Sequence, residues 1–401
     1  MSVRFWSISA FLICFFASTA YGFVDVAWWS SMAQLSASNL LSSSAVRPPP
    51  CLELQGLSPG QARICELFKD HMPAVGNGAR EAIRECEHQF RSNRWNCSTP
   101  PETGLIGPVH KFGTREAAFT YAIMSAGVTH EIGRRCRLGL LKSCGCSEAP
   151  KPPNLKEEWT WGGCGDNLEY GYRFARDFID VREKEENVKR SEAHGRTLMN
   201  RWNNEVGRKI LKRHTNPKCK CHGVSGSCNL KTCWMQLPAM REVGNLLNNK
   251  YRTARRIQIN SRGNMQFEEQ PEKRNPMKKK TRSLSELVFL DDSPDYCVED
   301  RQQGTVGTRG RQCRTDTTGP QACELLCCGR GYDTYEKEEV YKCNCKFQWC
   351  CEVVCQTCRN VTQIHVFSET SRSTIGFTSF GSNFEAKNTT RLPENISKSK
   401  D

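Results

Sequence analysis

The sequence predicts a disulfide-rich α+β protein. We expect a mainly α N-terminal domain that carries disulfide-clamped β-hairpins, followed by a small cysteine-rich β-hairpin C-terminal domain. Two observations predict this fold. Apolar residues recur at helical spacing through much of residues 51–259. Residues 296–358 contain 11 cysteines punctuated by glycines, a composition that buries little apolar surface and must be ordered by cross-links and short hairpins.

The first 22 residues have the features of a secretory signal peptide. Arg4 is their only charge, residues 5–17 are largely apolar, and Ala20 and Gly22 are the small residues of a cleavage site. The apolar run is shorter than the roughly 20 residues that span a bilayer. We therefore expect a chain secreted to the extracellular space, where disulfides persist. Loss of Cys14 leaves 23 of the 24 cysteines, so one thiol must stay free, pair between chains or be modified.

The next elements in order are a flexible lead-in and the helices of the N-terminal domain. Residues 23–50 are Ser- and Ala-rich and end in three prolines. Thr114 can cap a helix from residue 115 to about 136, which is apolar on most sides and should be buried. Asp166 or Asn167 can cap a second helix from 168 to about 184. Its apolar stripe comprises residues 168, 172, 175, 178 and 179, while its charged residues, including residue 180, should face solvent.

Charge and composition change after the N-terminal domain. Residues 260–295 contain a cluster of lysines and arginines with prolines, which predicts a solvated basic linker. Residues 359–401 are rich in Ser, Thr and Asn, which predicts a disordered tail. The formal net charge of the whole chain is +14. Outside the cell such a charge favours heparan sulfate and the matrix as partners and not nucleic acid, although solubility alone could also explain it.

Four closely spaced cysteines predict a first clamped hairpin. Cys219 and Cys221 are two residues apart, so on a strand they face the same side, and Cys228 and Cys233 return on the other arm. Pairing outer with outer and inner with inner gives bridges 219–233 and 221–228. They enclose a six-residue loop whose glycines permit a tight turn and which presents Ser225.

Three interpretations of Ser225 compete. A hydrolase nucleophile would need G-x-S-x-G, but Ser227 stands where the last glycine should be, and nothing identifies an acid to orient His222. A zinc site could use His222 with three cysteines, numbers 219, 221 and 228, but an oxidising compartment disfavours it. A contact or modification site is favoured. We therefore expect no catalytic residue, no metal site and no enzymatic activity.

The same plan recurs near the C-terminus. Nested pairing would give bridges 343–358 and 345–355, with Phe347, Trp349, Cys350 and Cys351 at the tip. An exposed aromatic tip is typical of a protein contact. The adjacent Cys350 and Cys351 either pair with each other or elsewhere. Consecutive Cα atoms lie about 3.8 Å apart, below the usual disulfide range, so spacing alone does not choose a bridge between them.

These strings resemble the Wnt family of secreted morphogens. The resemblance covers residues 51–358 and is carried by the segments 94–99 (RWNCST), 161–167 (WGGCGDN), 219–234, 327–332 (CCGRGY) and 343–351. It is nearest to the subgroup numbered five.

The resemblance implies a secreted, lipid-modified ligand that triggers developmental signalling. A membrane-bound O-acyltransferase would attach a monounsaturated fatty acyl group to Ser225, and a lipid-shielding carrier would serve secretion. The acylated loop would enter a groove on the cysteine-rich domain of a Frizzled receptor, and the second tip would grip the opposite side of that domain. A low-density-lipoprotein-receptor-related coreceptor or a Ror-type kinase would be the second receptor. The loop residues with this implied role are His222, Gly223, Val224, Ser225 and Gly226.

The resemblance also implies a disulfide pattern and one departure from it. A family cysteine is replaced here by Phe367, and its partner would have been Cys327, which becomes the candidate unpaired thiol. The C-terminal domain would then lack one bridge, worth about 2–4 kcal/mol. This loss leaves an alternative function, a matrix-bound Frizzled antagonist that recruits no coreceptor. The implied disulfide cysteines are Cys51 and Cys65, Cys86–Cys97, Cys136–Cys144, Cys146–Cys164, Cys219–Cys233, Cys221–Cys228, Cys297–Cys328, Cys313–Cys323, Cys343–Cys358, Cys345–Cys355 and Cys350–Cys351.

Four N-x-S/T sequons predict N-glycosylation. They begin at Asn96, Asn360, Asn388 and Asn395. Asn96 matches a family site, whereas the other three are motif matches only.

Overall fold

The computed structural model describes residue 51 and residues 56–98, 108–153, 155, 159–185, 192–268, 286–300 and 302–367. The predicted signal peptide, the lead-in, the middle of the predicted linker, and the sequons at Asn388 and Asn395 lie outside these residues. Among the helices described, none has the length and apolar character needed to cross a membrane.

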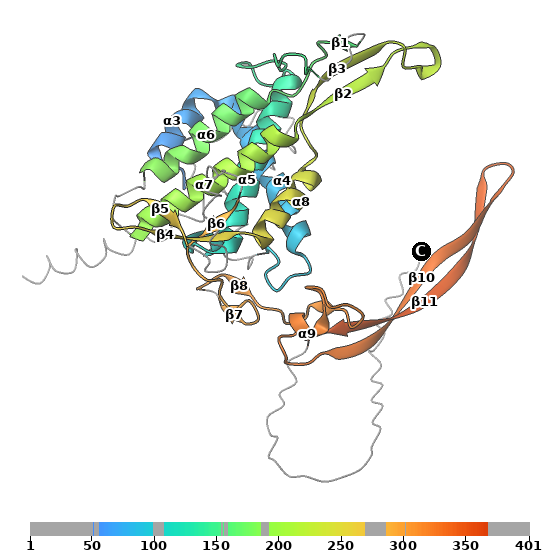
Figure 1. The fold of residues 1–401 in the computed structure, drawn as a ribbon. Coiled ribbons are helices and arrows are strands. Elements are labelled where there is room, and N and C mark those ends of the chain that lie inside the picture. Colours follow the sequence, from blue (N-terminus) through green and yellow to red (C-terminus); the bar gives the residue numbers. More distant parts are fainter. Residues whose placement is uncertain are drawn as a thin grey trace, which may run out of the picture. The chain divides into compact units, whose positions relative to one another are not determined.

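The N-terminal part is a helical assembly built around one central helix (Figure 1). Its helices are α3 (Pro59–Leu67), α4 (Met72–Phe90), α5 (Arg115–Arg137), α6 (Leu168–Glu185), α7 (Glu192–His214) and α8 (Met240–Arg252), with short 3-10 turns at Lys69–His71 and Pro108–Lys111. Helix α5 packs against α4, α6, α7 and α8 and is buried on almost every side, as predicted. The Thr114 side chain caps it by accepting from the amide of Ala117.

The predicted second helix is confirmed with one correction. Asn167 caps α6, because its side-chain oxygen accepts from the Tyr170 amide at 3.0 Å. The apolar stripe is buried at residues 175, 178 and 179. Asp180, which we placed on the solvent face, is only 5% exposed and pairs with Arg208 of α7, Nη2 to Oδ2, at 2.7 Å. The periodicity of α6 alone could not predict this burial, because the guanidinium that pairs with Asp180 comes from another helix.

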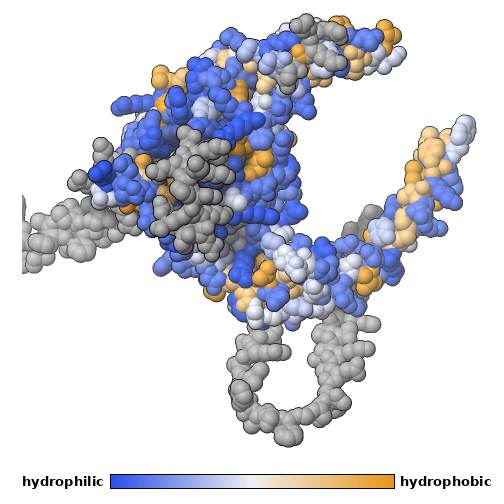
Figure 2. Space-filling model, viewed as in Figure 1, coloured by the Kyte–Doolittle hydropathy of each residue, from blue (hydrophilic) through white to orange (hydrophobic). Residues whose placement is uncertain are grey.

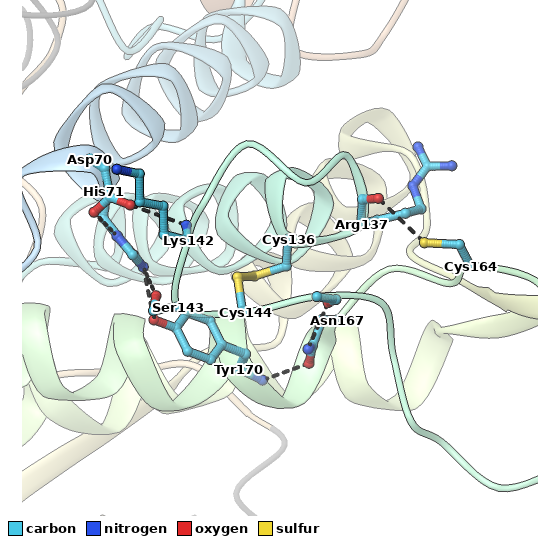
Figure 3. Close-up of a disulfide and its surroundings, with 11 residues drawn as sticks. Asp70, His71, Cys136, Arg137, Lys142, Ser143, Cys144, Cys164, Asn167 and Tyr170 are labelled. Atoms are coloured by element: carbon cyan, nitrogen blue, oxygen red, sulfur yellow. Dashed lines mark hydrogen bonds and ion pairs between the residues drawn. A yellow bond between two sulfur atoms is a disulfide. The ribbon is translucent and has the colours of Figure 1, made fainter.

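The loop that follows α5 is tied back to the helices by a disulfide and a polar cluster (Figure 3). Cys136 and Cys144 form the disulfide. The buried His71 ring contacts the Asp70 carboxylate through Nδ1 and the Tyr170 hydroxyl through Nε2, both at 2.8 Å. This loop leads into the base of the first hairpin, so its anchoring helps to position that hairpin.

Two three-stranded sheets flank the helices. In the first, β2 (Asn216–Cys221) pairs antiparallel with β3 (Lys231–Gln236), and β1 (Thr160–Trp161) lies parallel to β3. In the second, β4 (Arg255–Ile259) lies between β5 (Met265–Phe267) and β6 (Val288–Phe289). The linker predicted at 260–295 is therefore too long, since β5 and β6 fall inside it. Ile257 and Val288 pack with Ala117 and Met199, a long-range contact that local composition does not reveal.

The C-terminal part has little helix and one long hairpin (Figure 1). Its elements are β7 (Glu299–Asp300), β8 (Thr305–Val306), β9 (Gln312–Cys313), α9 (Cys323–Leu326), β10 (Asp333–Gln348) and β11 (Glu352–Val366). Residues 359–366 pair with residues 333–340. The tail predicted to begin at 359 therefore begins too early, because this segment is ordered by residue-by-residue pairing with β10, which composition does not reveal.

Ten disulfides are present in the described residues. They are 51–65, 86–97, 136–144, 146–164, 219–233, 221–228, 297–328, 313–323, 343–358 and 345–355. Every implied pairing is thus confirmed except that of Cys350 with Cys351. The free thiols among these residues are Cys327, Cys350 and Cys351.

Candidate binding site: two disulfide-clamped hairpins

The first hairpin is clamped twice below its tip. Cys219 lies directly opposite Cys233 in the register of β2 and β3, with 4.1 Å between their Cα atoms. Nearer the tip, Cys221 and Cys228 close the loop with a Cα–Cα distance of 4.6 Å. Two successive cross-links make the arms of this narrow hairpin resist splaying, so the tip is presented by a stiff support.

Contacts that the sequence did not indicate brace the base of this hairpin. The Trp161 indole donates to the Ala149 carbonyl at 2.9 Å. Lys231 lies 4.2 Å from the ring centre of Trp159, a cation–π distance. Gly163 approaches Trp234 so closely that a Cβ there would lie 2.8 Å from the indole. A two-residue strand is too short to show a period of two, so β1 could not be recognised from sequence alone.

The loop at the tip holds Ser225 in an exposed, left-handed turn. Ser225 has φ 57° and ψ 25°, which a non-glycine residue adopts at some cost. The amides of Gly223, Gly226 and Ser227 donate to carbonyls within the loop at 2.9–3.1 Å. A Cβ at Gly223 would overlap the Ser227 hydroxyl, so the turn needs glycine there. Val224 beside Ser225 is 90% exposed.

The chemistry available to Ser225 follows from these contacts. The hydrogen bonds that shape this loop run between backbone amides and carbonyls, whereas a serine nucleophile needs an adjacent base that is oriented toward it. The backbone amide of His222 donates to the Leu230 carbonyl. The cysteines of the zinc interpretation are consumed in disulfides, whereas zinc needs thiolates. The geometry suits an accessible hydroxyl that another protein modifies or contacts.

The second hairpin presents aromatic side chains at its tip. Bridges 343–358 and 345–355 clamp β10 to β11, and the strands end at Gln348 and Glu352, which face each other. Trp349 in the turn is 96% exposed, and Phe347 is 69% exposed. Apolar side chains also lie along the arms (Figure 2), among them Val340, Tyr341 and Val353. Large apolar groups held in water at a rigid tip are typical of a protein contact.

The bridge implied between Cys350 and Cys351 is not formed. Both residues are exposed free thiols with positive φ, 76° and 81°. The peptide bonds of the described residues are trans, and across a trans peptide adjacent Cα atoms lie at about 3.8 Å, closer than a relaxed disulfide requires. The turn between β10 and β11 therefore forms without a disulfide between these two cysteines.

Cys327 is free, as predicted, and Phe367 occupies the place of its missing partner. Phe367 is 1% exposed and packs in a small core with Cys313, Cys323, Leu326 and Cys327. Its backbone exchanges hydrogen bonds with Gly310 and Arg311. At the base of the second hairpin we expected only the loss of a disulfide to Cys327. The buried Phe367 ring instead provides apolar packing at that place.

Two predicted glycosylation residues lie in the described part of the chain. Asn96 is half-buried, and its side-chain oxygen accepts from Ser98. Asn360 is exposed on β11. Their modification stays a prediction.

Comparisons with known proteins agree with the resemblance. The model of the wnt family matches residues 53–368. Protein Wnt-2 of Caenorhabditis elegans is 63% identical over 346 residues, which cover 86% of this chain and 94% of the relative. Protein Wnt-5b of Xenopus laevis is 50% identical over 314 residues, covering 78% and 85%. A solved structure described as "Human WLS in complex with WNT8A" contains a chain 35% identical, with a TM-score of 0.49, covering 74% of this chain and 94% of that one.

Proposed function

This chain belongs to the Wnt family of secreted signalling ligands, and we propose that it binds Frizzled cysteine-rich domains through an acyl group on Ser225 and through the tip of its second hairpin. The observation that carries the proposal is the exposed Ser225 hydroxyl on a doubly bridged hairpin. A ligand that must deliver a lipid into a receptor groove needs such a stiff and accessible attachment point.

The energetics fit a transferable lipid. Burial of an acyl chain contributes roughly 0.8 kcal/mol per CH₂, and a single chain gives only marginal, reversible membrane attachment. An apolar protein groove can therefore compete with the membrane for the chain. The exposed Val224 beside the attachment point would enter the same groove and add apolar contact.

The proposal has further partners. A membrane-bound O-acyltransferase would modify Ser225, and a lipid-shielding carrier would cover the acyl chain during secretion. A low-density-lipoprotein-receptor-related protein or a Ror-type kinase would be the coreceptor, and heparan sulfate would retain the protein in the matrix. The chain itself would act by binding and not by catalysis. A serine-directed phosphonate probe should leave Ser225 unlabelled, and labelling of Ser225 would favour a hydrolase.

The first experiment tests the lipid. The peptide that contains Ser225, isolated from secreted protein, should carry the mass of a monounsaturated fatty acyl ester. Ser225→Ala should abolish binding to a purified Frizzled cysteine-rich domain. Ser227→Ala is the matched control, because it removes an exposed hydroxyl two residues along the same loop, and it should bind normally. Full-strength binding by Ser225→Ala would reject the lipid half of the proposal.

The second experiment tests the aromatic tip. Trp349→Ala should weaken binding to the same domain by about 2 kcal/mol or more, the size expected of a buried aromatic anchor. Tyr341→Ala is the control, since it removes another exposed aromatic ring from the arm of the same hairpin. Equal small effects of both substitutions would remove the tip from the receptor contact.

The alternative function was a Frizzled antagonist whose damaged C-terminal part recruits no coreceptor. Phe367 anchors the hairpin base without the missing bridge, which favours an intact signalling ligand. Purified protein should bring Frizzled and coreceptor together at the cell surface. Receptor binding with no such recruitment would favour the antagonist.

A further inference from the structure

Three sulfur atoms lie together in the small core beside α9, at the base of the second hairpin (Figure 1). Cys313 and Cys323 form a disulfide, and the free Cys327 is only 2% exposed in the same core. The Sγ atom of Cys327 lies 3.7 Å from the Sγ atom of Cys313, so the thiol touches the bridge. The proposed receptor contacts make no use of this thiol.

The spacing of two cysteines along α9 explains why both reach the same partner. Cys323 begins α9, and Cys327 follows its last residue, four positions later. Residues four apart on a helical turn lie on one face, and the Cys327 amide donates to the Cys323 carbonyl at 2.9 Å, which closes that turn. Both side chains therefore face β9, where Cys313 pairs with His365 of β11.

The surrounding side chains shield these sulfurs from other thiols. Cys313 and Cys323 are both buried, and Leu326 and Phe367 complete the core around them. A thiol in the solvent does not reach the bridge in the folded protein, whereas Cys327 already touches it. Because thiol–disulfide exchange requires direct attack of a thiolate on a disulfide sulfur, the nucleophile available to this bridge is Cys327.

We propose that Cys327 exchanges with this bridge, so that the C-terminal part alternates between a 313–323 disulfide and a 313–327 disulfide. The Cys327 thiol loses its proton, and the thiolate attacks Cys313 Sγ. The bond between Cys327 and Cys313 forms as the bond from Cys313 to Cys323 breaks, and Cys323 leaves as a thiolate that takes up a proton. One disulfide and one thiol remain, so the step consumes no oxidant and no reductant.

The exchange moves the point at which β9 is fastened to α9. Four residues of helix correspond to about 6 Å along its axis, so one form holds β9 at the start of α9 and the other holds it at the end. Because β9 pairs with β11, the base of the second hairpin has two covalent forms. Burial raises the pKa of the Cys327 thiol, and the Arg330 guanidinium acts in the opposite direction. The thiolate is therefore scarce, and exchange should take minutes to hours.

The first test maps the disulfides of the full-length secreted protein. Cys350→Ser combined with Cys351→Ser removes the exposed thiols, so that exchange through them is ruled out. After one day at pH 8, the protein is acidified to stop exchange and digested with pepsin, which can cut at the leucines between positions 323 and 327. Both linkages, 313–323 and 313–327, should be found, with the second in at least about 1% of the molecules, as for a minor state a few kcal/mol above the major one. Its absence at that level would overturn the proposal.

Two single variants isolate the two forms. Cys323→Ser removes the leaving thiol, so the secreted variant should contain Cys313 bridged to Cys327. Cys327→Ser is the matched control, because it removes a sulfur from the same face of α9 and should leave only the 313–323 bridge. Recovery of Cys323→Ser with Cys313 and Cys327 both as free thiols would show that the two do not bond and would overturn the proposal. Where Cys323→Ser is not secreted, the map of the chain that retains all three core cysteines decides the question.

Discussion

Replacing Phe367 with alanine should loosen the base of the second hairpin. The ring is almost fully buried in a core of five residues, and Phe→Ala in such sites costs about 3–5 kcal/mol. The Arg330 guanidinium lies 4.3 Å from the ring centre, a cation–π contact worth about 0.5–1 kcal/mol. Because this core is small, we expect the total loss of stability to lie at the lower end of these values, at about 3 kcal/mol. A disulfide at this place would contribute about 2–4 kcal/mol, so the ring is comparable to the bridge that it replaces.

Hydrogen exchange measures this loss locally. The amides that report it are those of Gly310 and Phe367, which bond across the hairpin base, and those of the β9–β11 pairing at residues 312–313 and 365–366. A loss of about 3 kcal/mol raises their opening equilibrium on the order of 100-fold. Phe347→Ala removes the same ring from an exposed position and should leave exchange at the base unchanged. Exchange within threefold of wild type in Phe367→Ala would refute the argument that Phe367 anchors the hairpin.

Three other predictions follow from the buried charges and the free thiols. A thiol reagent should label Cys350 and Cys351 in the native protein but Cys327 only after unfolding, because burial raises the pKa of the Cys327 thiol; rapid labelling of native Cys327 would contradict its burial. Arg208→Met should lower the free energy of unfolding by about 3–5 kcal/mol, since it leaves Asp180 buried without its partner, whereas Lys209→Met should cost little in the same urea titration. Although burial opposes ionisation of Glu205, the Tyr172 hydroxyl and the Arg208 guanidinium hold the pKa of Glu205 below its ordinary 4.5. Its stabilisation is therefore complete above pH 4.5 and lost as pH falls through the lower folded pKa, and Glu205→Gln should flatten the stability curve in that acid range.

Much of the candidate site could be predicted from the sequence because its determinants are local. The spacing of Cys219, Cys221, Cys228 and Cys233 defines two nested bridges, and the loop between them is too short to place Ser225 anywhere but at a tip. In the second hairpin, the spacing of the cysteines likewise predicts two nested bridges, 343–358 and 345–355. The caps of α5 and α6 were likewise predictable, since a capping side chain binds an amide only three residues away.

The sequence by itself therefore determined the nested hairpins, the unpaired Cys327 and the family, whereas the export signal stays a prediction. Only the tertiary structure decided which polar groups are buried and where the ordered segments end. Asp180 is buried because Arg208 reaches it from another helix, β5 and β6 are strands because β4 lies between them, and Phe367 is core because β9 and α9 fold against it. Spacing encodes contacts within a few residues, whereas burial and pairing depend on segments that meet only when the whole chain has folded.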